Sequence, residues 1–332
     1  MNPRERYVAM IEGRDVDIVP RLPILMGYAA DFIGSDYGAF ASDYRVRTEA
    51  NICCAKVFGI DQMNTMSDPY CETQGYGAEI IYVKNGVPRC VRPPFEDALD
   101  PGEIKKPDPM TATRMRDRIE AIREYKRRTD SEYSIMGWVE GPAAEAADLR
   151  GLENFLCDMI EEPERSGELM DVCVDVGIAF ARAQVESGAD TIGIGDAICS
   201  QMSVAMYREL VWPREKRLVN AIRAMGAYAR LHICGNITHL LSLIAELDVN
   251  IVDIDWLVEM RHAREVLGPE KVLAGNLDPA SVILRGEPGE IRRRFREIYS
   301  QIGGRYMVNA GCEIPPGTPE ENLLAVCEPI AG

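Results

Sequence analysis

Two residues in the stretch "RLHICGNIT" (residues 230–238) have side chains of the metal-ligand type. His232 is one of three histidines in the 332-residue chain, and Cys234 follows it two positions later. On a β-strand, side chains two positions apart point the same way from Cα atoms roughly 6.5 Å apart, so both reach one ion. The pair alone leaves two interpretations open: a metal half-site, or a histidine and a thiol that end a buried strand.

A third ligand on another strand would favour the metal site, and Cys312 is the candidate. It ends the predicted last strand in "NAGCEIPPG", between a glycine and a proline-bearing turn. Cys157 and Cys173 lie in helical patterns, where a cysteine can serve as a small hydrophobic core residue. Cys312, at a strand end, is less well explained in this way. Cys53 and Cys54 are adjacent, point apart in regular structure and are assigned to a buried helix face. Ten unevenly spaced cysteines do not indicate a disulfide framework.

One histidine and two cysteines suit Zn²⁺ with an open fourth position, which is the pattern of catalytic zinc. Two thiolates cancel the charge of the ion, so a substrate thiol bound there would lose its proton and stay electron-rich. Such a thiolate is suited to attack a methyl group. With an ether as substrate, the ion would instead stabilise the oxyanion left when a methyl group is removed.

Further polar residues follow predicted strands, where a parallel barrel has its active site. We expect Asp68 and Glu140 to act in acid/base catalysis or in hydrogen bonding to the substrate, and Glu140 is also a candidate fourth zinc ligand. The alternative is that such residues cap the next helix or form turns, an interpretation that also applies to Asp253 and Asp255. The residues expected to bind substrate are Tyr28, Asp196, Asn236 and Asn276.

Eight β-rich segments are expected to position these residues. Strands that alternate with helices and are continuously apolar indicate a parallel sheet covered on both faces. The expected strands are residues 21–27, 59–67, 133–141, 189–196, 227–236, 249–256, 271–278 and 305–313. Eight such units predict an α/β fold of the (β/α)8 TIM barrel type, a single domain over residues 1–332 with an N-terminal extension. An open doubly wound sheet has little support, because no GxGxxG turn follows the first strand.

The segment 75–94 departs from this alternation. Its two β-like runs surround Asn85-Gly86, a dipeptide favoured in tight hairpin turns. We therefore expect an antiparallel β-hairpin inserted after the second strand. A polar, proline-bearing connector then leads to a helix expected over residues 113–128.

The composition excludes some classes of partner. A net charge of −16 and a pI of about 4.8 argue against nucleic acid or an anionic membrane as the main partner. Neither a signal peptide nor an apolar run of about 18 residues is present, so the expected location is the cytoplasm. The hydrophobic content of 46% is enough for a large core.

Several motifs together resemble the uroporphyrinogen decarboxylase superfamily. The matching stretches are "MSDPY" (66–70), "GWVEGP" (137–142), "HICGN" (232–236), "AGNLDPAS" (274–281) and "NAGCEIPPGTPEEN" (309–322). They span nearly the whole chain. The resemblance implies a (β/α)8 barrel, in agreement with the eight strands counted independently.

Departures from the decarboxylases indicate another branch of this superfamily. Residues 20–34 contain Arg21 but not the arginine-rich motif that holds the porphyrinogen carboxylates, and such a substrate would need more cations. Cys312 stands where the decarboxylases have histidine. The combination resembles the zinc-dependent methyltransferase branch, whose members exchange methyl groups with a corrinoid (cobalamin-binding) protein. The resemblance implies that His232, Cys234 and Cys312 bind the zinc.

The direction of methyl transfer stays open, and we favour removal of a methyl group from a methoxylated aromatic substrate to corrinoid cobalt. The aromatic residues that would hold the ring, or instead pack a core, are Tyr28, Phe32, Tyr37, Tyr70 and Tyr76. The reverse direction would pass a methyl group from the corrinoid to a thiol or another small acceptor. Porphyrinogen decarboxylation and a non-catalytic role in a corrinoid complex are further alternatives.

Overall fold

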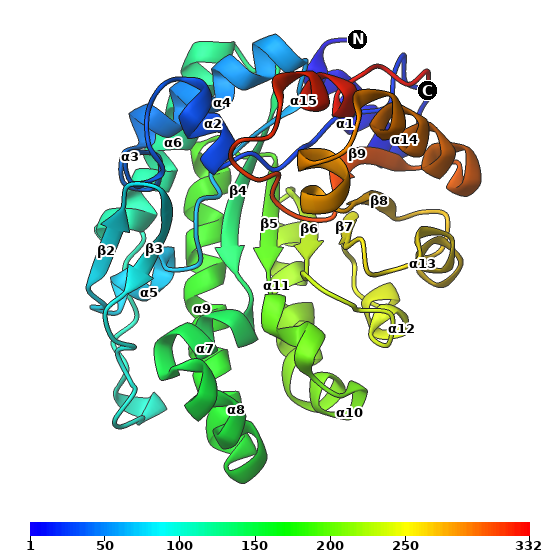
Figure 1. Cartoon of the computed structure of the whole chain (residues 1–332). Coiled ribbons are helices and arrows are strands. Elements are labelled where there is room, and N and C mark those ends of the chain that lie inside the picture. Colours follow the sequence, from blue (N-terminus) through cyan, green and yellow to red (C-terminus); the bar gives the residue numbers. More distant parts are fainter.

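Seven parallel strands form the curled central sheet of the computed structural model, which describes residues 1–332 (Figure 1). Their order in the sheet is β1-β4-β5-β6-β7-β8-β9, the same as in the chain. The strands are β1 (Gln62–Asn64), β4 (Ser134–Glu140), β5 (Thr191–Gly195), β6 (Tyr228–His232), β7 (Ile251–Ile254), β8 (Val272–Leu277) and β9 (Tyr306–Ala310). Because all neighbours are parallel, the C-terminal ends of the strands share one rim.

Helices connect the strands and cover the outer side of the sheet (Figure 1). They are α1 (Pro3–Glu12), α2 (Gly27–Phe32), α3 (Tyr37–Ser42), α4 (Tyr44–Phe58), α5 (Cys71–Gly75), α6 (Thr113–Thr129), α7 (Pro142–Arg150), α8 (Leu152–Glu161), α9 (Pro163–Ser187), α10 (Val204–Met206), α11 (Trp212–Ala224), α12 (Leu241–Ala245), α13 (Met260–Leu267), α14 (Pro288–Ile302) and α15 (Glu320–Val326). Short 3₁₀ or π turns are η1 (Pro101–Glu103), η2 (Ala197–Gln201), η3 (Tyr207–Val211) and η4 (Pro279–Leu284).

The longest helix, α9, illustrates why these segments are helical. Pro163 occupies its first position, where the missing N–H costs nothing, and Gly188 ends it with a positive φ of 122°. Between them, apolar side chains at helical spacing, such as Met170, Val174 and Phe180, are buried against the sheet and its neighbouring helices. None of the helices combines the length and apolar character needed to cross a membrane.

The expected first strand, residues 21–27, is wrong as a strand. Only Arg21 pairs, in an isolated parallel bridge with Val308 of β9. The extended segment nevertheless contacts both edges of the sheet, because Leu22 N donates to Val308 O (2.7 Å) and Asp61 N, just before β1, donates to Arg21 O (2.9 Å). The curled seven-stranded sheet is therefore TIM-barrel-like, with a non-regular segment between its first and last strands.

The reason for this irregularity lies in the local sequence. Pro20 and Pro23 flank the bridging residues and lack the backbone N–H groups that a continuous ladder requires. The other seven expected strands are present, each shorter than expected; residues 227–236, for example, contain the five-residue strand β6. The helix expected over residues 113–128 is present as α6.

The segment after β1 contains an antiparallel pair, β2 (Ile80–Val83) and β3 (Gly86–Cys90). Its turn lies at Lys84 and Asn85, one residue earlier than the expected Asn85-Gly86, because Val83 pairs with Gly86. Neither turn residue has a positive φ, so the turn is not of type I′, which needs a positive φ at both positions. The pair lies beside α3 (Figure 1), where Tyr37 N donates to Lys84 O.

Candidate metal centre

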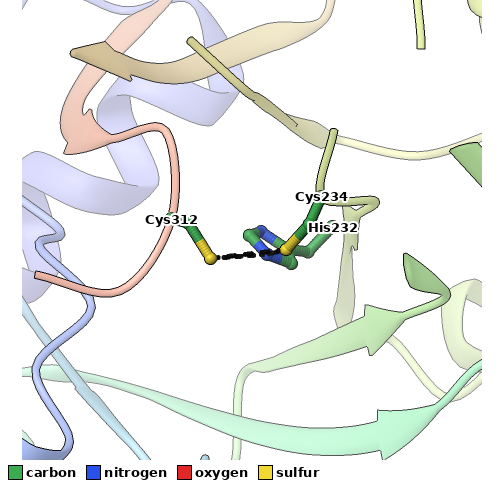
Figure 2. Close-up of side chains that lie close together, drawn as sticks. All are labelled: His232, Cys234 and Cys312. Atoms are coloured by element: carbon green, nitrogen blue, oxygen red, sulfur yellow. Dashed lines mark hydrogen bonds between the residues drawn. The ribbon is translucent and has the colours of Figure 1, made fainter. Parts of the chain in front are cut away.

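His232, Cys234 and Cys312 come together at the C-terminal rim of the sheet (Figure 2). His232 is the last residue of β6, Cys234 lies in the loop that follows, and Cys312 lies just beyond β9. The Nε2 atom of His232 is 2.9 Å from Sγ of Cys234 and 3.9 Å from Sγ of Cys312, and the two sulfur atoms are 3.3 Å apart. The fold thus joins two cysteines that are 78 positions apart in sequence.

Two glycines allow the loops to bring these side chains together. Gly235 follows Cys234 with a φ of 97°, and its N–H donates to Oδ2 of Asp255, which holds the loop against β7. Gly311 precedes Cys312 and passes close to Trp256, because a Cβ atom there would lie 2.6 Å from the Trp256 backbone nitrogen. A side chain at position 311 would push the Cys312 loop away from the cluster.

The second ring nitrogen of His232 contacts Asp253 of the neighbouring strand. Nδ1 of His232 is 2.9 Å from Oδ2 of Asp253, and the two residues are paired in register between β6 and β7. The guanidinium of Arg230 also contacts this carboxylate, with Nε 3.0 Å from each oxygen. Burial raises the pKa of Asp253, but Arg230 and His232 outweigh it and hold that pKa below its usual range. A charged Asp253 therefore holds a proton of His232 on Nδ1, so Nε2 is the ring nitrogen that would give up its proton to bind a metal.

The hydrogen bond between the two thiols shifts their pKa values in opposite directions. The hydrogen bond from Cys234 lowers the pKa of Cys312 to about 4, against the opposing effect of burial, and His232 lowers it further. The same hydrogen bond raises the pKa of Cys234. Burial lowers the pKa of His232, but hydrogen bonds to Asp253 and Cys312 outweigh it and raise this pKa to about 10.

Glu140 lies at the same rim, two strands away from His232. It pairs with Gly195, which pairs with His232, so their backbones are about 10 Å apart at the usual strand spacing. Nε1 of Trp138 donates to Oε1 of Glu140 (2.8 Å), and the indole ring lies edge-on to the His232 ring, with centroids 6.0 Å apart. Burial, and then repulsion from Glu72, raise the pKa of Glu140 well above its usual value.

The chain is similar to known proteins over nearly its whole length. The sequence profile of the family "Uroporphyrinogen decarboxylase (URO-D)" matches residues 2–331. The chain belongs to the URO-D family. A methylcobamide:CoM methyltransferase (MtaA) from Methanosarcina barkeri is 26% identical over 333 residues, which cover 97% of this chain and 96% of the relative. A methylated-thiol–coenzyme M methyltransferase from Methanosarcina mazei is 27% identical over 331 residues, covering 98% of this chain and 88% of the relative.

The fold of this URO-D family member is also that of a solved structure. A methyltransferase from Methanosarcina mazei matches with a TM-score of 0.90 at 24% identity, covering 98% of this chain and 97% of the other. The family expected from the sequence motifs is therefore confirmed.

The donor set of this URO-D protein fits Zn²⁺. One imidazole nitrogen and two sulfur atoms lie within 4.8 Å of one another, which is the ligand chemistry that zinc prefers. The contact from Asp253 to the other ring nitrogen is the carboxylate support that metal-binding histidines usually have. Asp253, which the sequence suggested as a turn or cap residue, is instead part of the site. In "VNIVDIDW", Asp253 alternates with apolar residues of a predicted strand, and this pattern could have indicated its role in the site.

Asp68 and Tyr28 have other contacts in this URO-D fold. Both carboxylate oxygens of Asp68 accept from Arg114 of α6, and Asp68 is 8% exposed. Burial raises the pKa of Asp68, but Arg114 outweighs it and lowers that pKa. Tyr28 is buried in α2, where its ring stacks on Phe32 and meets Phe58 edge-on. The acid/base role of Asp68 and the substrate role of Tyr28 stay predictions.

The other expected substrate-binding residues hydrogen-bond to backbone groups. Asp196 is fully buried at the end of β5 and accepts from Ala144 N (2.7 Å) at the start of α7. Oδ1 of Asn236 accepts from Thr238 N, and the Asn276 amide donates to Val258 O. These three residues therefore shape the rim loops, and their contact with a substrate stays a prediction. Asp196 also belongs to a second buried group, with Cys199 and Glu215.

Two cavities open at the rim near the cluster. The first, here called the Glu140 cavity, has a volume of about 420 Å³ and is lined by Pro69, Tyr70, Cys90, Pro93, Glu140, Ala144, Ala147, Asp148, Gly151, Leu152, Ala197 and Ile198. The second, the Glu313 cavity, has a volume of about 260 Å³ and is lined by Gly27, Asp31, Tyr37, Asn85, Gly86, Val87, Glu313 and Pro316. Glu313, which lines the second cavity, directly follows the cluster residue Cys312 in the sequence.

Proposed function

We propose that this URO-D family protein is a zinc-dependent methyltransferase that moves a methyl group between the cobalt of a corrinoid protein and a small substrate. The observation that carries the proposal is the cluster of His232, Cys234 and Cys312, with Asp253 behind the histidine. Bound there, Zn²⁺ would supply an open position at which a substrate thiol loses its proton and becomes the methyl acceptor. Two full-length relatives with corrinoid- or thiol-linked methyl transfer in their names support the same assignment.

We further propose that the methyl group passes from the methylated corrinoid to a thiol. Both relatives are named for transfer to coenzyme M, a thiol. The methoxylated aromatic substrate favoured by the sequence has less support, because four of the five rings expected to hold it pack against other aromatic side chains and only Tyr70 lines the Glu140 cavity. Tyr28 stacks on Phe32, Tyr37 stacks on Phe40, and the half-buried Tyr76 meets Phe95 edge-on.

Porphyrinogen decarboxylation has little support, because Arg21, the basic residue in the region that binds the substrate carboxylates in the decarboxylases, is already paired. Arg21 is 8% exposed, and its Nε is 3.1 Å from Oδ2 of Asp61, while Nη1 donates to Cys327 O. A guanidinium held in this way is not free to bind a substrate carboxylate.

The chain's own residues have distinct tasks in the proposed reaction. Asp253 fixes the orientation of the His232 ring through Nδ1, so that Nε2 faces the two thiols. Trp138 covers one side of the His232 ring and, through Nε1, holds the carboxyl group of Glu140 at the same rim. The buried, charged Asp253–Arg230 pair makes the position of the histidine independent of the substrate.

A methyl-transfer assay tests this proposal. Methylcobalamin serves as donor and 2-mercaptoethanol as acceptor, and loss of methyl–cobalt absorbance is followed with zinc-loaded protein. We expect transfer by the wild type and by Cys157→Ser, a change at an exposed cysteine, and at least 100-fold slower transfer by Cys312→Ser. Equal rates for all three proteins would overturn the proposal. Methylation of a Co(I) corrinoid by methoxyarenes, without transfer to thiols, would reverse the proposed direction.

A further inference from the structure

The Glu140 cavity carries charged groups of one sign only. Glu140 and Asp148 are its ionisable carboxyl groups, and none of its lining residues is lysine, arginine or histidine. The Glu313 cavity has the same character, since it is lined by Asp31 and Glu313 and by no basic residue. An anionic ligand would therefore meet carboxyl groups, and no basic side chain, in either cavity.

More carboxyl groups lie behind the wall of the Glu140 cavity. Glu72 is 2% exposed; its Oε1 accepts from Glu140 N (3.0 Å), and its Oε2 has no hydrogen-bond partner. Glu145 is buried beside it, with both oxygens close to the hydroxyl of Thr73. Burial raises the pKa of Glu72. Burial, followed by repulsion from Glu72, raises the pKa of Glu140, Glu145 and Asp148.

The two basic residues that act on Glu72 do not neutralise this group. Arg114 and Arg118 lower the pKa of Glu72 somewhat from behind the cavity. Arg114 makes a bidentate ion pair with Asp68, and Arg118 contacts both Asp68 and Asp117. The carboxyl groups of the cavity thus lack a cation of their own, and a cationic ligand would favour their charged forms.

The cavity is also placed and shaped for the end of a small substrate. Glu140 lies at the same level of the sheet as His232, about 10 Å away by strand spacing. Small apolar side chains, Ala144 and Ala147 of α7, and the ring of Tyr70 form part of the walls. Apolar walls, an aromatic ring and a carboxylate together favour an ammonium group over a hydrated anion.

We infer that the Glu140 cavity binds the ammonium end of a cationic substrate while its thiol reaches the His232–Cys234–Cys312 cluster. This inference rests on the proposed methyl transfer and adds the charge class of the substrate. Glu140 and Asp148 bind the ammonium group, and the acidic cavities exclude a sulfonate or carboxylate at that end. The substrate charge thus differs from that of coenzyme M, the sulfonate named for the two relatives.

The experiment compares three thiols of equal length that differ at one end: cysteamine, 2-mercaptoethanol and 2-mercaptoethanesulfonate. Binding to the zinc-loaded protein is measured by calorimetry in the absence of any corrinoid. We expect cysteamine to bind at least about tenfold more tightly than the sulfonate, the effect of a few screened charges at a half-buried site. The three ligands also differ in the pKa of their thiol groups. The deciding quantity is therefore, for each ligand, the ratio of the dissociation constant of the variant to that of the wild type.

Three single variants provide that ratio. Glu140→Gln and Asp148→Asn should each weaken cysteamine binding about tenfold and change 2-mercaptoethanol binding less than about twofold. Glu186→Gln removes the same charge from an exposed site at the opposite end of the sheet and should change neither. Asp148 is only partly buried, so Asp148→Asn tests the inference even if Glu140→Gln does not fold.

The outcomes separate this inference from the proposed function. Tighter binding of the sulfonate than of cysteamine, no effect of Asp148→Asn, or no binding of any thiol would overturn the inference. Methyl transfer with a preference for the sulfonate would support the proposed function and contradict the inference of a cationic substrate. Cysteamine could also bind tightly through the carboxyl groups without any methyl transfer. That result would support the cationic ligand class and contradict the proposed reaction.

Discussion

Oδ2 of Asp253 lies 2.9 Å from Nδ1 of His232, on the side of the ring opposite the two cysteines. The two residues face each other on neighbouring strands, so the contact is built into the register of the sheet. Arg230, two residues before His232, holds the same carboxylate in place. This relationship leads to a first prediction about metal affinity.

Asp253→Asn should lower the affinity for Zn²⁺ by about 10- to 100-fold, because a neutral amide supports the imidazole less well than a carboxylate. Competition with a chromophoric chelator measures the affinity. Asp248→Asn, at an exposed site on the far end of the sheet, is the matched control and should leave it unchanged. An unchanged affinity in Asp253→Asn would mean that His232 is not a zinc ligand.

Removal of one thiol should remove the metal. Purified wild-type protein is expected to contain about one zinc ion per chain, and Cys312→Ser much less, because a hydroxyl is a poor zinc ligand. Cys157→Ser removes an exposed cysteine of α8 and should keep the full content. Elemental analysis gives the stoichiometry, and a chelator should lower the melting temperature of the wild type but not of Cys312→Ser.

Glu72 should make the protein less stable as the pH rises. Burial raises the pKa of Glu72 from 4.5 to about 7, so the native state keeps a proton that the unfolded chain loses above pH 4.5. The contribution of Glu72 to the free energy of unfolding therefore falls between about pH 4.5 and pH 7 and is level above that. Glu72→Gln mimics the protonated acid and should add on the order of 2 kcal/mol at pH 8 and little at pH 4.5.

Urea unfolding at the two pH values measures this effect. The exposed Glu186→Gln is the control, and it should show the same pH dependence as the wild type. A Glu72→Gln protein that gains no stability at pH 8 would show that folding does not raise the pKa of Glu72.

Asp68 should contribute to stability through its ion pair with Arg114. Asp68→Ala leaves a buried guanidinium without its partner, which should cost about 3 kcal/mol or more in the free energy of unfolding. The double variant Asp68→Ala/Arg114→Met should recover part of that loss. If Asp68→Ala instead kept its stability and lost methyl transfer, the result would support the acid/base role expected from the sequence.

The amino-acid sequence by itself determined the strand–helix alternation and the pairing of His232 with Cys234. Both depend on local patterns, since continuous apolar runs predict parallel strands and a spacing of two places side chains on one face. It did not predict that residues 21–27 lack a regular ladder, because the effect of Pro20 and Pro23 depends on which strands they lie between. The hairpin turn was placed one residue late for a similar reason, since Val83 pairs with Gly86.

Only the tertiary structure decided which strand-end residues share the site. Cys312 reaches Cys234 across 78 positions because β6 and β9 belong to one curled sheet, and Asp253 reaches His232 because their strands are in register. Asp68 and Asp196 have the same residue type as Asp253, yet their carboxylates contact Arg114 and the start of α7. A side chain's type limits its possible roles, but its non-local neighbours select one of them, because burial and charge partners are properties of the folded chain.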